Sequence, residues 1–148
     1  MHMSRPDLRD LSVAILFGVV AAPLWAGMIG FLSAFTQLPL LASLAREFGS
    51  GIKPWVPTYM LAWEVVGGAV CALVIALPLG YLLRRHVLAM WLLFALLFLA
   101  IFAWPSSYID DAEPQFFALS YPGPWVFLAW SALFVRVGHR LRRQSLVA

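Results

Sequence analysis

The sequence predicts an all-α, polytopic integral membrane protein with four transmembrane helices and a short periplasmic helix at the membrane interface. Of its 148 residues, 63% are hydrophobic and only 11% are charged, whereas a soluble domain contains about 25% charged residues. The apolar residues form runs, several of which reach the roughly 20 residues that cross a bilayer as a helix. Basic residues stand between these runs, mostly on one side of the predicted bundle. We therefore expect residues 1–148 to form a single transmembrane domain.

The predicted spans follow from the apolar runs and from the polar or proline-containing segments between them. They cover about residues 11–32, 58–83, 87–104 and 124–143. We interpret the first run as a span and not as a cleaved signal peptide, because cleavage after Ala22 would place Pro23 directly after the cut. Pro23 is also expected to kink the first helix.

The first loop, residues 33–57, is expected to contain a short amphipathic helix at about residues 39–48. Pro39 suits the first turn of a helix, and Gly49 suits its C-terminal stop. Spacings of three and four residues put the large apolar side chains on one face, which is typical of a helix that lies on a membrane surface. This face consists of Leu40, Leu41, Leu44 and Phe48.

Glu64, in the second span, is the only acidic residue inside any of the apolar runs. Carboxylates are rare inside membranes and by default indicate a functional site, so Glu64 is our candidate for a protonatable or ligand-binding group. The alternative is a structural glutamate that reaches the headgroups, since it lies only about 9 Å along the helix from Thr58.

Two rows of small residues, spaced four apart, predict close helix packing, because small side chains let helices approach in lipid. We expect the rows of the first and second spans to pack on each other within one chain, although a dimer interface would use the same chemistry. The rows contain Gly18, Ala22 and Ala26 in the first span, and Gly68, Ala72, Ala76 and Gly80 in the second.

The second outer loop, residues 105–123, contains no lysine or arginine and carries Asp110, Asp111 and Glu113. These carboxylates could bind a divalent cation or a basic partner. They have no spaced set of further ligands, so an ordinary solvated loop is the favoured interpretation, and no metal site is predicted.

The fourth span ends in a basic segment in which Arg136, Arg140 and Arg143 share a helix face with His139. These arginines are candidates for binding lipid headgroups or a partner. The alternative is that these arginines only fix the orientation of the chain in the membrane, which would require the same residues.

The basic residues also predict the orientation. Eight of the ten lie on the side of the termini and two on the other side, which favours cytoplasmic termini under the positive-inside rule. In a bacterial cell this is an inner-membrane protein. The eight are Arg5, Arg9, Arg84, Arg85, Arg136, Arg140, Arg142 and Arg143; the two are Arg46 and Lys53.

Several function classes are disfavoured by the composition. The single cysteine, Cys71, excludes a disulfide framework within the chain and a thiol pair. The net charge of +3 is small and scattered, so nucleic acid is not an expected partner. No nucleophile–base pair or phosphate-binding loop is recognisable, so we predict no catalytic residues, no cofactor and no enzymatic activity.

Two functions remain. The first is a non-enzymatic accessory or structural subunit of a larger membrane assembly, which contacts lipids and either other membrane subunits or further copies of itself. The second is a small oligomeric transporter or channel that uses Glu64. A more distant alternative is an enzyme that acts on lipids at the periplasmic face.

Overall fold

The computed structural model describes residues 5–103 and 122–146, which are almost entirely helical and contain no strand. The α-helices are α1 (Arg5–Leu32), α2 (Leu38–Phe48), α3 (Val56–Leu82), α4 (Val87–Phe102) and α6 (Pro122–Ser145). A π-helix, η1 (Ser33–Gln37), joins α1 to α2, and a 3₁₀-helix, η2 (Gly49–Trp55), joins α2 to α3.

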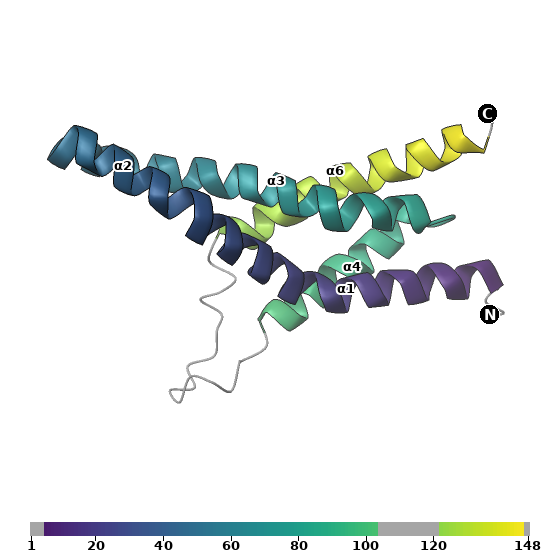
Figure 1. The fold of residues 1–148 in the computed structure, drawn as a ribbon. Coiled ribbons are helices and arrows are strands. Elements are labelled where there is room, and N and C mark those ends of the chain that lie inside the picture. Colours follow the sequence, from purple (N-terminus) through teal and green to yellow (C-terminus); the bar gives the residue numbers. More distant parts are fainter. Residues whose placement is uncertain (1–4, 104–121, 147–148) are drawn as a thin grey trace.

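The start of α1 and the end of α6 lie at the same end of the molecule (Figure 1). From there α1 runs the length of the molecule and continues into α2, and α3 returns beside them. The hairpin made by these helices extends beyond α4 and α6 (Figure 1). We call its outermost part, residues 38–59, the hairpin tip.

The helix boundaries follow from residues that stop or start a helix. The chain leaves α2 at Gly49, whose φ of 55° suits a glycine at a helix end. His86 precedes α4 in the left-handed conformation, with a φ of 48°. Pro57 lies in the first turn of α3, where its missing N–H costs no hydrogen bond. Pro23 lies inside α1, which bends near its middle (Figure 1).

The helices pack as two close pairs, α3 with α6 and α1 with α4. The closest approach is at Gly80 and Gly138, where an added Cβ would overlap the carbonyl oxygens of Val135 and Leu77 respectively. A Cβ on Gly18 would lie 2.8 Å from the Cβ of Leu97 in α4. Glycine is needed at these places because it lets one helix backbone touch the next.

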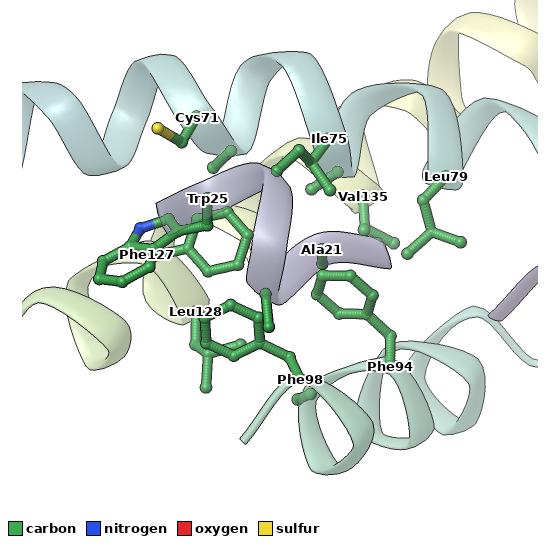
Figure 2. Packing of buried hydrophobic residues seen from close by; sticks show 14 of the residues in the cluster. Ala21, Trp25, Cys71, Ile75, Leu79, Phe94, Phe98, Phe127, Leu128 and Val135 are labelled. Carbon is green, nitrogen blue, oxygen red and sulfur yellow. The ribbon is translucent and has the colours of Figure 1, made fainter. Parts of the chain in front are cut away.

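An aromatic cluster joins the two pairs of helices (Figure 2). Trp25 of α1 stands edge-on to Phe98 of α4, with 6.1 Å between ring centroids. Phe98 in turn lies 4.8 Å from Phe127 of α6. Phe94, Phe98 and Phe127 are completely buried, so α1, α4 and α6 are held by ring packing and not by polar contacts at this level.

The described residues contain one helical run, Asp7–Leu82, that is long and apolar enough to cross a membrane, and the chain reverses within it at η2. The shorter apolar helix is Val87–Phe102. Large apolar side chains are exposed along α1, α3 and α4. An all-helical chain with a long apolar helix and an apolar surface is compatible with a membrane protein.

The first loop differs from its prediction. A helix is present at Leu38–Phe48, as expected, but residues 33–57 do not form a loop around it. The π-turn of η1 carries the helical path from α1 directly into α2, and η2 supplies the reversal. Pro39 does not interrupt this path, because it lies at the start of α2, where only one N–H is lost.

Candidate functional site

Glu64 lines a small cavity where the hairpin leaves the four-helix part of the molecule. The cavity has a volume of about 140 Å³ and lies between α1 with η1, the first half of α3 and the start of α6. Its walls are formed by Trp25, Ile29, Ser33, Gln37, Met60, Trp63, Glu64 and Gly123. This volume is enough for several water molecules or a small organic ion.

The π-helix η1 builds the polar wall of this cavity. Ser33 Oγ donates to Gln37 Oε1 at 2.8 Å across one turn. Gln37 Nε2 lies 2.9 Å from the sulfur of Met60, and Tyr59 Oη donates to the main-chain oxygen of Gln37 at 2.9 Å. Gln37 is only 4% exposed, so these contacts fix a buried amide against α3. π-Turns are rare and often mark functional sites.

Three polar atoms of the cavity residues are enclosed without a hydrogen-bond partner among the described residues: Oε2 of Glu64, and Nε1 of Trp25 and of Trp63. A carboxylate oxygen accepts hydrogen bonds and an indole N–H donates them. Each such group is costly to bury alone, by about 1–3 kcal/mol. All three residues line the cavity, and Glu64 is the one with an acidic side chain among them, so the cavity favours a guest with positive charge.

The glycines in the rows of small residues contact other helices than expected. Gly18 packs against α4, at Leu97 and Phe94, while Gly68 and Gly80 pack against α6, at Phe127 and Val135. The glycines of the two rows thus face different neighbours, because α1 packs mainly against α4 and α3 mainly against α6.

Burial within the rows is uneven. All four residues of the α3 row are buried, as are Gly18 and Ala22 in α1, but Ala26 is exposed. α1 and α3 do contact each other. For example, a Cβ added at Gly67 would lie 3.0 Å from Cδ1 of Ile29. That contact lies nearer the hairpin tip than the one predicted.

The arginines of α6 have two different environments. Arg136, Arg140 and Arg143 line a groove of about 640 Å³ between α6 and the first half of α4. Arg142 points instead to the end of α3, where its Nη1 donates to the oxygens of Leu83 at 3.0 Å and of Leu82 at 3.2 Å. The carboxylates Asp110, Asp111 and Glu113 lie outside the described residues.

The turn between α3 and α4 is held by the side chains of Asp10 and Arg142, which we call the clamp. Neither residue was predicted from the sequence. Asp10 of α1 is 2% exposed, and its Oδ2 accepts the backbone N–H groups of Arg84 at 2.9 Å and Arg85 at 2.7 Å. Arg142 binds the carbonyls on the other side of the same turn. An acidic residue before an apolar run and a basic residue after one are ordinary features, so no local signal marks either residue.

Comparison of the chain with models of protein families, with curated proteins and with solved structures finds no match in any of the three. Three features of the structure bear on function: the hairpin tip, the Glu64 cavity and the basic groove.

Proposed function

We propose that this chain is a four-span membrane protein that acts as a non-enzymatic accessory or structural subunit of a larger membrane assembly. The four spans correspond to α1, α3, α4 and α6. The apolar surface of these helices and the low charge of the chain support a membrane location. The common end of the two termini and the excess of basic residues there support cytoplasmic termini in a bacterial inner membrane.

The observation that carries the subunit proposal is the length of the hairpin. α1, η1 and α2 follow one another without interruption, with 28, 5 and 11 residues. At 1.5 Å per residue, α1 alone is roughly 42 Å long, whereas the hydrocarbon layer is about 30 Å thick. The hairpin tip therefore stands beyond the hydrocarbon, on the side away from the termini.

The hairpin tip is nevertheless apolar. Phe48 is 61% exposed and Trp55 is 68% exposed. Together with Leu44, Ile52 and Tyr59 they line a groove of about 410 Å³ on the tip. An apolar groove outside the lipid needs a cover, because exposed apolar area of this kind marks an interaction site. We propose that it receives an apolar helix from another membrane subunit.

The test is a pair of double variants expressed in the native host. The unmodified chain should co-purify with a partner subunit at a fixed stoichiometry. Phe48→Ala/Trp55→Ala should reduce the amount of co-purified partner by at least about tenfold, because large aromatic side chains dominate interface energies. The matched control, Leu92→Ala/Leu96→Ala, removes exposed apolar side chains from α4, within the lipid-facing part. It should leave the complex intact.

The readout is the mass of the complex in mild detergent, combined with a photo-crosslinker at residue 55. A discrete heteromeric mass with one crosslinked subunit is expected. A lone chain, or a complex containing only copies of this chain, contradicts the accessory-subunit proposal. A complex that survives the Phe48→Ala/Trp55→Ala change places the partner elsewhere than on the hairpin tip.

A second candidate function, an oligomeric transporter that uses Glu64, is favoured by the cavity described above. One oxygen of its carboxylate is enclosed without a partner among the described residues, and Trp25 and Trp63 line the same cavity. Glu64 stands roughly 27 Å along α3 from Leu82 at 1.5 Å per residue. It is therefore close to the outer boundary of the hydrocarbon, a place from which a guest could enter from the periplasm.

The Glu64→Gln variant separates the two functions. A transporter that moves protons or cations through this carboxylate should lose its proton flux in proteoliposomes, measured with a pH-sensitive dye, while its melting temperature stays within about 2 °C, because the amide preserves the shape of the side chain. Glu47→Gln, which changes an exposed carboxylate on α2, is the control. Equal flux in Glu64→Gln and the unmodified protein rules out the transporter and leaves the subunit proposal unaffected.

A further inference from the structure

The basic groove between α4 and α6 combines an apolar wall with a positively charged edge. Val87, Leu88 and Trp91 of α4 form one side. Ala132 and Val135 continue the apolar lining on α6. The edge nearest the C-terminus is formed by Arg136, His139, Arg140 and Arg143, and none of the described residues that line the groove is a carboxylate.

The groove exists because α4 and α6 are in contact over only part of their length. They meet through Phe94, Phe98 and Phe127 in the centre of the molecule. Further along, Trp91 Nε1 donates to Ser131 Oγ at 2.9 Å, and Ser131 in turn donates to the oxygen of Leu128 at 2.8 Å. This contact fixes the indole of Trp91 as part of the groove wall. Beyond it the two helices leave a space that neither fills.

The arginines at this edge are available to a ligand. Arg136, Arg140 and Arg143 are exposed, and none of them forms an ion pair within residues 5–103 and 122–146. Arg142, one residue away, is occupied by the carbonyls of the α3 end. α6 thus divides its four arginines between one that holds the fold and three that line the groove.

We propose that this groove binds an anionic phospholipid. Guanidinium groups bind phosphate oxygens through paired, charge-assisted hydrogen bonds. A basic pocket between transmembrane helices at the cytoplasmic side is the place where anionic headgroups bind. The apolar wall formed by Val87, Leu88 and Trp91 would receive an acyl chain, which a free phosphate ion lacks. The lipid would fill the space between α4 and α6 and hold their cytoplasmic halves together.

This proposal rests on the membrane location proposed above, but it does not depend on a partner at the hairpin tip. A chain that does not enter bilayers would fail to reconstitute at all. A chain that reconstitutes but shows no preference for anionic lipid would contradict only the lipid site.

The experiment compares nanodiscs of phosphatidylcholine alone with nanodiscs that contain one-third phosphatidylglycerol. Three proteins are compared: the unmodified chain, Arg136→Gln/Arg140→Gln, and the control Arg84→Gln/Arg85→Gln. The control removes the same charge from exposed side chains at the same end of the molecule, outside the groove. Helix content by circular dichroism should be equal in all three, because the substituted side chains are exposed.

The unmodified chain and the control should melt at a higher temperature in the anionic nanodiscs and should retain phosphatidylglycerol in native mass spectra. The groove variant should lose this shift and retain the lipid at least about tenfold less well, since each basic residue near the surface contributes measurably to anionic-lipid binding. Inorganic phosphate at millimolar concentration should not displace the lipid.

Three results would overturn the proposal: equal lipid retention in the groove variant and the unmodified chain, equal loss in both variants, or displacement of the lipid by inorganic phosphate. Equal loss in both variants would mean that the whole basic end of the molecule, and not the groove, attracts the lipid.

Discussion

Adding a single methyl group at Gly80 should strongly destabilise this protein. An added Cβ there would overlap the main-chain oxygen of Val135, so the two helices would have to move apart. Overpacking of this kind typically costs about 1–3 kcal/mol, and sometimes more. Backbone atoms cannot rotate away as a side chain can, so we expect Gly80→Ala to reach at least the upper end of that range. In thermal unfolding this corresponds to a loss of roughly 5–10 °C.

The matched control is Gly30→Ala, because no atom lies within 4 Å of an added Cβ at that position. Alanine is also the better helix former, so the control should be neutral or slightly stabilising. Gly138→Ala should resemble Gly80→Ala, since its Cβ would overlap Leu77 on the same interface. The double variant Gly80→Ala/Gly138→Ala should lose less stability than the sum of the two single variants, because one separation of the helices accommodates both methyl groups. An unchanged melting temperature in Gly80→Ala would show that α3 and α6 are not in backbone contact.

Asp10→Ala should have the second large effect. The Asp10 carboxylate accepts two backbone N–H groups of the α3–α4 turn from a position that is 2% exposed. Hydrogen bonds to a charged group contribute about 1.5–3 kcal/mol each, and donors left unpaired add their own cost. We therefore expect a loss of at least about 2 kcal/mol in the free energy of unfolding.

Trypsin cleavage gives a second, local measurement, because Arg84 and Arg85 are exposed residues of this turn and trypsin cleaves after arginine. Without the Asp10 carboxylate the turn should be cleaved several-fold faster in detergent. Asp10→Asn should fall between the two proteins, since it retains an acceptor oxygen without the charge. Glu47→Ala, which removes an exposed carboxylate from α2, should change neither stability nor cleavage. Normal stability and normal cleavage in Asp10→Ala would contradict the clamp.

The long helices α1, α3, α4 and α6 lie at the apolar runs of the chain, and these runs can be recognised in the sequence alone. The tight connection before α4 is equally local, since Leu82 ends one helix and Val87 begins the next. The short helix Leu38–Phe48 was predictable from its Pro and Gly boundaries. Its continuity with α1 was not, because Ser33–Gln37 is polar enough to suggest a loop and a π-turn has no sequence signature that distinguishes it from one.

The partners of each helix were harder to predict than the helices themselves. A row of small residues indicates that some helix approaches closely, but α1, α4 and α6 were all possible neighbours for the row in α3. The choice depends on the packing of bulky rings such as Trp25, Phe98 and Phe127, which no spacing rule encodes. Glu64 was identified because it is the only carboxylate in an apolar run. Its companions Gln37 and Trp25 come from another helix, and nothing local connects them to it.

The pairing of α3 with α6 has a consequence for how the chain is made. Gly80 and Val135 touch, yet they are far apart in the sequence. At a synthesis rate of about 5–20 residues per second, α3 therefore waits roughly 3–11 s until its neighbour has been made. During that interval the surface of α3 that packs on α6, including Gly68 and Gly80, is uncovered. Chains released before α6 is synthesised would keep this surface open and remain targets for proteases. α6 thus completes a packing surface that α3 presents much earlier in synthesis.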